Sequence, residues 1–233
     1  MGVEIADSTT QRAELAAAVF EERQRVKDAL EKTGALELTQ TDRQVRAVAA
    51  TANSAAYVQI TEVRVLPFPF DAVSDEIWAF LGNASLLEQQ GKLSRDVGFE
   101  NDVLHAETNL QYTATVGDGT LMSTAAFSKA FNADHMALAY VSHGKIERNG
   151  NKGSPFVVIE KGWTLIEPTG SNTAECILRC VSHLEPRAVD GAITVKYDED
   201  SDEIQTLKEL GEGVYSQTTT YIYSLVEQNL SSQ

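Results

Sequence analysis

The sequence predicts an α+β protein in which an antiparallel sheet lies between N-terminal helices and a long C-terminal helix. Three observations lead to this fold class. Residues 104–112 alternate apolar and polar side chains, as the half-buried strand of an antiparallel sheet does. Segments rich in Gly and Asn separate the strand-like stretches that follow, which is typical of hairpin turns. Apolar residues recur at helical spacing over residues 202–229.

The N-terminal part is expected to be helical. Residues 10–32 are rich in Ala, Glu, Arg and Leu, and residues 41–56 have a helical pattern after a break at Gly34. We therefore divide the chain into an N-terminal helical segment, residues 1–56, and a main domain, residues 57–231. The helices either pack on the main domain or bind a protein partner, and both interpretations stay open. The apolar stripe of the first helix consists of Leu15, Val19, Val26 and Leu30.

The main domain begins with a strand and a sharp corner. Alternating side chains predict a strand over residues 57–66, and Pro67 and Pro69 end it because each proline lacks a backbone donor. Asp71 or Ser74 is expected to cap the next helix. The apolar stripe of that helix consists of Val73, Ile77, Trp78 and Leu81.

Four further strands are expected over residues 120–131, 133–145, 155–167 and 174–185, joined as a meander. Both cysteines, Cys176 and Cys180, fall in the last of these strands. Four residues along a strand span about 13 Å, which is too far for a disulfide. We expect two reduced, buried thiols, as in a cytoplasmic protein.

The C-terminal helix carries glycines at its centre. Gly211 and Gly213 each cost about 1 kcal/mol relative to Ala in a helix interior. They indicate a close neighbour or room for a bound molecule. Asp200 and Glu203 are expected to form a capping pair at the start of the helix.

Composition limits the function classes. The 233 residues include 34 acidic and 19 basic side chains, a formal net charge of −15. This charge argues against nucleic-acid binding and against attachment to anionic membranes. No transmembrane segment or signal peptide is recognised, so we expect a cytoplasmic protein with at most transient membrane contact.

The order of elements resembles the helix-grip fold of the START-like superfamily, which includes START lipid-transfer domains and the Bet v 1-type ligand carriers of plants. The resemblance covers residues 57–230, and the corner at residues 66–71, leading into residues 73–81, carries its most specific part. In such a fold a curved antiparallel sheet wraps around the long C-terminal helix. Family members enclose a cavity for an apolar ligand between the two.

The resemblance implies non-catalytic binding or transfer of a hydrophobic small molecule, such as a lipid, sterol or fatty acid. The expected cavity-lining residues mix apolar surface with a few hydroxyls, as in small-molecule sites. They are Leu104, Tyr112, Phe127, Met136, Leu138, Tyr140, Trp163, Cys176, Leu178, Cys180, Leu184, Val214, Thr218, Tyr221 and Ile222.

Two other functions stay open. START-like relatives also include cyclases and hydrolases, and an enzyme would need polar groups in the cavity. The candidate donors for this are Tyr112, Tyr140, His135, Tyr221 and Tyr223. Alternatively, the fold is a ligand-free scaffold that uses its N-terminal helices for protein contacts. For the charged pair found in some START cavities, Glu62, Arg64 and Arg179 are candidates by position, although alternation directs Arg179 outward.

No metal or cofactor is expected. The four histidines show no metal-ligand spacing, and no phosphate-binding or nucleophile motif occurs. Residues 198–209 place acids at several positions of a calcium loop, but Glu203 stands where such a loop needs Gly. We interpret this segment as a solvated linker and helix N-terminus.

Overall fold

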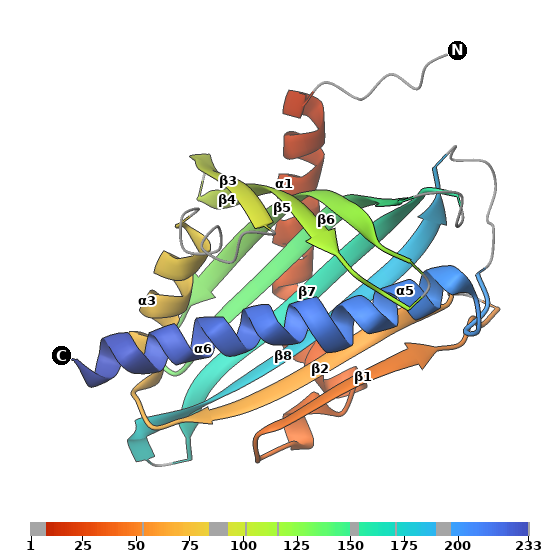
Figure 1. Cartoon of the computed structure of the whole chain (residues 1–233). Helices are drawn as coiled ribbons and strands as arrows, with labels where there is room; N and C mark the ends of the chain where they lie inside the picture. The colour runs from red at the N-terminus through yellow and green to blue at the C-terminus, as the bar shows by residue number, and fades with distance from the viewer. Residues whose placement is uncertain are drawn as a thin grey trace.

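A computed structural model of the chain describes residues 8–52, 54–83, 93–100, 102–115, 117–149, 154–170, 172–189 and 197–232 (Figure 1). The helices are α1(Ser8–Gln24), α2(Val26–Lys32), the 3-10 turn η1(Ala35–Glu37), α3(Phe70–Leu81), α5(Asp202–Leu210), the π-helix η2(Gly211–Tyr215) and α6(Ser216–Ser231). The strands are β1(Asp42–Val48), β2(Tyr57–Leu66), β3(Leu93–Glu100), β4(Val103–Tyr112), β5(Gly119–Phe131), β6(Met136–Arg148), β7(Phe156–Thr169) and β8(Asn172–Ala188). None of the helices in these ranges is long and apolar enough to cross a bilayer.

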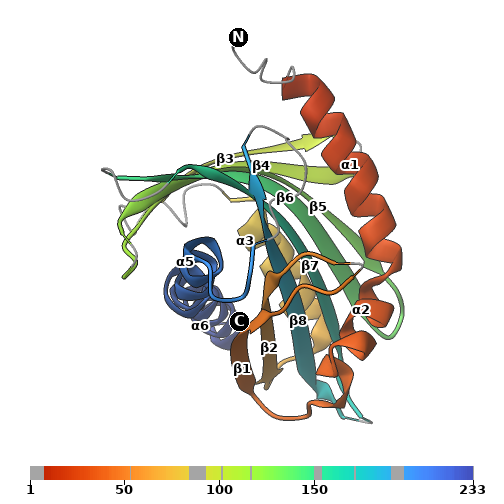
Figure 2. The same ribbon diagram turned by 90° about the vertical axis from the view of Figure 1, so that its right-hand side faces the viewer.

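All eight strands form one antiparallel sheet in the order β1-β2-β8-β7-β6-β5-β4-β3. β3 to β8 follow one another as a meander, and β2 pairs with β8, where Val58 lies opposite Leu184. β1 and β3 are the two edges, so the sheet curves without closing (Figure 2). With the C-terminal helix across its concave face, this is the helix-grip architecture, and the α+β prediction is confirmed.

The two faces of the sheet are covered by different helices (Figures 1 and 2). α5, η2 and α6 cross the concave face, and α1 and α2 lie on the convex face. Leu15 and Val19 of α1 are buried in a convex core with Ala139 and Val181 of the sheet. The apolar stripe predicted for residues 10–32 therefore packs on the main domain. A protein partner for these helices stays a prediction.

The corner between β2 and α3 forms where it was predicted, but it is capped differently. Pro69 is the N-cap residue and makes no side-chain cap hydrogen bond. Asp71 Oδ1 accepts from Ala72 N at 2.9 Å, and Ser74 Oγ donates to the Phe70 carbonyl oxygen at 2.5 Å. These contacts stay within the first turn, so the predicted Asp71 or Ser74 cap was wrong.

The helix predicted over residues 41–56 was also wrong, because residues 42–48 form the edge strand β1. β1 pairs with β2 along its whole length, from Asp42 opposite Val63 to Val48 opposite Tyr57. Seven ladder pairs outweigh a weak local helix preference. As a result Val45 packs on the concave core.

The long C-terminal helix is confirmed, with two refinements. Ser201 caps it by accepting from Ile204 N at 3.3 Å, so the predicted Asp200–Glu203 capping pair was wrong. The two central glycines fall in the π-helix η2. A Cβ at Gly211 would lie 3.1 Å from both Ile60 and Val45, whereas a Cβ at Gly213 would meet nothing within 4 Å.

Candidate functional site

The concave face beneath α5 and α6 carries two apolar clusters. One lies under α5 and includes Ile60, Leu184 and Leu207. The other lies under α6 and α3 and includes Met136 and Leu178. On β2, β7 and β8, polar or charged side chains such as Glu62, Glu160 and Ser182 lie between the two clusters. The polar and charged side chains of the concave face therefore lie between its two apolar clusters.

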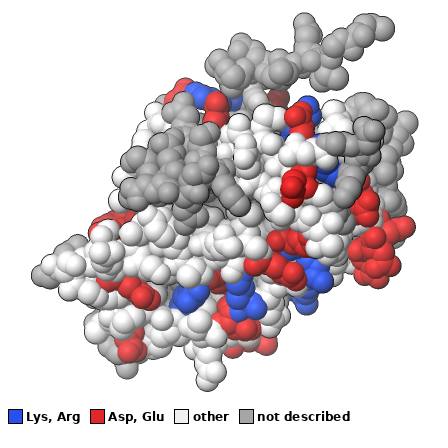
Figure 3. Space-filling model, viewed as in Figure 1, with Lys and Arg blue, Asp and Glu red and all other residues white. Residues whose placement is uncertain are grey.

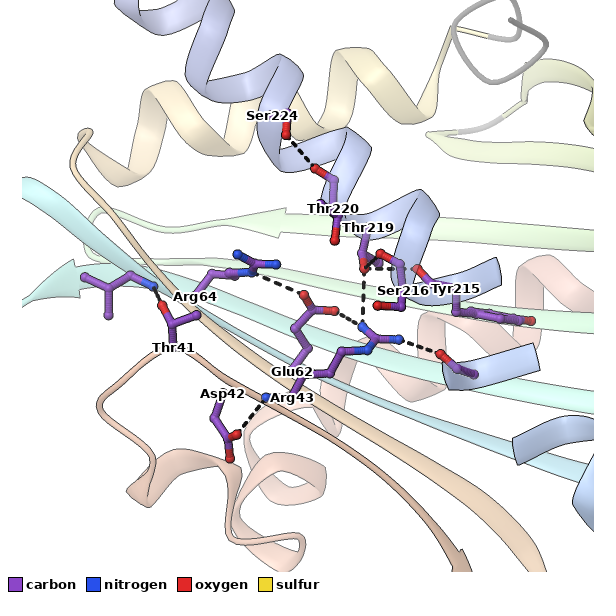
Figure 4. Close-up of polar contacts among 12 residues, drawn as sticks. Thr41, Asp42, Arg43, Glu62, Arg64, Tyr215, Ser216, Thr219, Thr220 and Ser224 are labelled. Atoms are coloured by element: carbon purple, nitrogen blue, oxygen red, sulfur yellow. Dashed lines mark hydrogen bonds and ion pairs between the residues drawn. The ribbon is translucent and has the colours of Figure 1, made fainter. Parts of the chain in front are cut away.

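The first polar group is an ion network around Glu62 (Figure 4). Arg43 of β1 pairs with one carboxylate oxygen of Glu62, and Arg64 Nε lies 3.3 Å from the other. Arg43 also donates to the carbonyl oxygen of Gly211 at 2.9 Å and to Thr219 Oγ1 at 3.2 Å. The network therefore connects the edge of the sheet to η2 and α6.

Burial explains why Glu62 needs two arginines. Its side chain is 4% exposed, and a buried carboxylate is costly unless it is paired. The Arg64 guanidinium lies 5.0 Å from the ring centroid of Tyr223, which adds a cation–π contact from α6. Arg179 instead pairs with Glu167 and donates to the Leu38 carbonyl oxygen on the convex side, as alternation predicted.

The second polar group surrounds the carboxyl of Glu160 on β7. Tyr140 of β6 and Tyr215 of η2 both donate hydroxyl hydrogen bonds to it, the latter at 2.8 Å. The Tyr140 hydroxyl is also 2.8 Å from Ser182 Oγ of β8. Side chains from three strands and the π-helix therefore converge on one buried carboxyl group.

Burial controls the protonation of this group. It raises the pKa of the Glu160 carboxyl, while the hydrogen bonds from Tyr140 and Tyr215 act in the opposite direction. Burial and the neighbouring Glu160 charge hold the pKa of Tyr140 and Tyr215 well above the usual value. Both tyrosines therefore keep their protons at neutral pH and act as hydrogen-bond donors.

The two cysteines share the concave face and are free thiols, as predicted; Cys176 is buried, whereas Cys180 is only partly buried. Burial raises the pKa of Cys176 to about 12 and that of Cys180 to about 11. Neither thiol forms a thiolate at neutral pH, so nucleophilic chemistry is not favoured. In the part of the chain that the structure describes, no three His, Cys, Asp or Glu side chains are grouped to hold a metal ion.

The structure brings most of the predicted cavity residues to the concave face or to the helix above it. Phe127, Met136, Leu138, Cys176, Leu178, Cys180 and Ile222 belong to the cluster under α6 and α3, and Tyr112, Leu184 and Val214 to the cluster under α5. Leu104 is fully buried opposite Phe127, and Tyr140 joins the Glu160 network. Thr218 and Tyr221 are half-buried on α6, where Tyr221 contacts Phe80 edge-on.

Trp163 is the exception, and its prediction as a concave residue was wrong. It belongs to the convex core beneath α1 and α2, and its indole Nε1 donates to Glu22 at 3.2 Å. Both faces of β7 are covered by helices, and residues 162–166 are all buried. Hydrophobic alternation therefore gave no signal for the direction of Trp163.

Sequence reasoning missed several polar residues of the site. Glu160, Tyr215 and Thr219 were not singled out, Ser182 was placed on the face of the two cysteines but given no role, and Arg43 was placed in an expected helix. The sequence did indicate that Glu160 faces the interior, because it lies between Val158 and Gly162 on the otherwise apolar face of its strand. No local pattern indicated Tyr215, because its hydrogen-bond partner Glu160 is 55 residues away in the chain.

The surface of α6 is nearly uncharged. Glu227 is its only charged residue. On the face seen in Figure 3 the charged side chains border a largely uncharged area. A small pocket of about 210 Å³ opens between α3 and α6, with Phe80 and Val226 in its lining.

Comparisons with known proteins give similarity in fold only. No protein-family model matches the chain, and a search of curated proteins found no match. Among solved structures, the Zhui aromatase/cyclase from Streptomyces sp. R1128 is similar with a TM-score of 0.42 at 13% identity, over 74% of this chain and 94% of that one. A conserved protein from Geobacillus kaustophilus is similar with a TM-score of 0.41 at 15% identity, over 75% of this chain and 95% of that one. Human STARD10 is similar with a TM-score of 0.41 at 8% identity, over 78% of this chain and 72% of that one. Similarity at this level supports no particular ligand or reaction.

Proposed function

We propose that this protein binds or transfers a hydrophobic small molecule, such as a lipid, sterol or fatty acid, without changing it chemically. The ligand lies between the sheet and the C-terminal helix. The observation that carries the proposal is the composition of the concave face, where two apolar clusters flank the buried groups around Glu62 and Glu160. Small-molecule sites combine a mainly apolar lining with a few fixed polar groups in this way.

In the proposed site, apolar side chains bind the body of the ligand and polar side chains orient it. Leu138, Phe127 and Leu178 contact the ligand body, and their burial there contributes roughly 25 cal/mol per Å² of apolar surface removed from water. The hydroxyls of Tyr140 and Tyr215 orient any polar group of the ligand. Tyr215 belongs to a π-helix, a helix irregularity that is frequent at functional sites.

Native mass spectrometry of the purified protein tests the proposal, followed by solvent extraction and lipid analysis. We expect an added mass that extracts as one lipid class, either as purified or after incubation with cholesterol, oleate or phosphatidylcholine. A clean unliganded mass under all these conditions would exclude the carrier function and shift attention to partners of the N-terminal helices.

A pair of leucine variants shows where the ligand lies. Gly213→Leu adds a side chain to η2 at a position where a Cβ meets no atom within 4 Å. Ser224→Leu adds the same side chain at an exposed position of α6 and is the matched control. We expect Gly213→Leu to lower the bound fraction while Ser224→Leu leaves it unchanged. Equal uptake by both variants would remove η2 from the site.

An enzyme is the second candidate, and Glu160 is the observation that favours it. A buried carboxyl whose pKa is raised by burial, and which accepts hydrogen bonds from two phenols, is a candidate for proton transfer to or from a substrate. The test is time-resolved mass analysis of a candidate polyketide-type substrate with wild type and with Glu160→Gln. Turnover that disappears in Glu160→Gln supports an enzyme, and an unchanged bound molecule supports a carrier.

A further inference from the structure

A groove of about 1020 Å³ lies on the convex side of the sheet, on the opposite face from the site beneath α6. α2 forms one wall. The floor consists of side chains from β1, β2, β7 and β8, and residues of the loop that joins β1 to β2 close one side. The groove is therefore a separate feature, formed where the N-terminal helices meet the sheet.

The charge of this groove is opposite to that of the protein. Its lining holds five basic and three acidic side chains, whereas the whole chain has 19 basic and 34 acidic ones. Each of the acids, Glu22, Asp28 and Glu185, is already ion-paired with a base of the groove. Arg46 is exposed and takes part in none of the ion pairs among the residues that the structure describes. The groove thus concentrates positive charge in an acidic protein, and its field favours an anion.

The floor of the groove is aromatic. The rings of Tyr57 and His183 lie 4.5 Å apart between centroids, and those of His183 and Trp163 lie 5.0 Å apart. The Trp163 indole is held in place by its hydrogen bond to Glu22, whose other oxygen is 2.6 Å from Lys161 Nζ. The Tyr57 and His183 rings are tilted by 41°, and the buried Trp163 ring stands edge-on to His183 at 78°. A flat ring can therefore stack on Tyr57 or on His183, while Trp163 supports His183 from beneath.

His183 contributes the face of its ring rather than its Nε2 atom. That nitrogen is fully buried and has no hydrogen-bond partner among the described residues, so a molecule in the groove does not reach it unless the ring moves. Arg46 lines the same groove, and its side chain is exposed and accessible to an anion.

We infer that the convex groove binds a small molecule that joins an aromatic ring to a carboxylate, sulfonate or phosphate. The ring stacks on Tyr57 or His183, above the buried Trp163, and the anionic group pairs with Arg46. This site is independent of the proposed hydrophobic site, because it uses the other face of the sheet.

NMR of the indole N–H groups tests the inference directly. The chain has two tryptophans, Trp163 in the groove and Trp78 on α3, so Trp78 is an internal reference. The probe is 2-naphthoate, and 2-naphthalenemethanol is its neutral analogue. We expect 2-naphthoate to shift the Trp163 signal alone and to bind at least roughly tenfold more tightly than the alcohol. A shift confined to Trp78, or equal affinities for the two probes, would overturn the inference.

Charge-reversal variants assign the anion contact. Arg46→Glu changes the groove, and Lys27→Glu makes a similar charge change at an exposed position of α2 that does not line it. We expect Arg46→Glu to weaken 2-naphthoate binding at least about fivefold and Lys27→Glu to leave it within about twofold. Equal weakening by both variants would mean long-range attraction only and would overturn the assignment to Arg46. Unshifted indole signals of the unliganded variants confirm that they fold.

Discussion

Gly162 of β7 lies opposite Tyr140 of β6, and the ring of Tyr140 occupies the space where a side chain of residue 162 would stand. A Cβ at residue 162 would lie 1.8 Å from Tyr140 Cε1. The missing side chain lets the phenol lie flat across the sheet, with its hydroxyl beside Glu160 and Ser182. A glycine on one strand thus determines the position of a hydrogen-bond donor on the next.

Gly162→Ala should therefore displace Tyr140 and destabilise the fold. A methyl group inserted into a closely packed interior costs about 1–3 kcal/mol. Urea unfolding measures the loss. Gly98→Ala on β3 is the matched control, because nothing lies within 4 Å of its Cβ, and its effect should stay within about 0.5 kcal/mol. Similar losses in both variants would show that the Tyr140 contact is unimportant.

The fold was largely predictable because its signals are local. The alternation of apolar and polar side chains predicted the strand β2, and two prolines predicted its end; the structure has it at the predicted bounds, Tyr57–Leu66. The C-terminal helix was recognisable from its apolar spacing. The edge strand β1 was not, because its conformation depends on pairing with β2, and a helix-like local composition hid its alternation.

The site was less predictable because its polar groups meet through tertiary structure. Glu160 and Tyr215 are 55 residues apart, and Arg43 and Gly211 are 168 apart. Local patterns carry no information about such pairs. Trp163 shows a second limit: on a strand with helices over both faces, apolar residues no longer indicate one direction.

Acid should weaken the packing of the N-terminal helices. His105, His143 and His183 come from β4, β6 and β8 and lie on the convex side, and burial lowers the pKa of each. The pKa of His183 falls from 6.5 to about 4. Its neutral form is favoured in the folded state, so its contribution is fully present above pH 6.5. That contribution is lost as the pH falls from 6.5 toward 4.

For His183 this contribution amounts to about 3 kcal/mol by linkage. Arg46 and Lys161 oppose its protonation, while Glu22 of α1 favours it. Urea unfolding at pH 7.5 and pH 4.5 should show a large loss in the wild type and a smaller one in His183→Asn. An identical pH dependence in both proteins would assign the acid sensitivity to other groups.

Removing Arg43 should leave a buried carboxylate short of a partner. Arg43→Ala is expected to cost about 3 kcal/mol, because Glu62 keeps only Arg64 and the carbonyl of Gly211 loses a donor. Lys32→Ala breaks an exposed ion pair and should cost at most about 0.5 kcal/mol. Chemical unfolding compares the two variants, and a small loss in Arg43→Ala would mean that Arg64 alone satisfies Glu62.

Replacing each glycine of η2 by alanine should change the stability of the protein in opposite directions. Gly211→Ala forces its Cβ against Ile60 and Val45 at 3.1 Å and should destabilise by about 1 kcal/mol or more. Gly213→Ala meets no neighbour, and it should stabilise by up to about 1 kcal/mol because alanine is the better helix former. Thermal unfolding of the two variants measures both signs. If Gly213→Ala also destabilised the protein, the π-helical backbone itself, rather than packing against β1 and β2, would require glycine at that position.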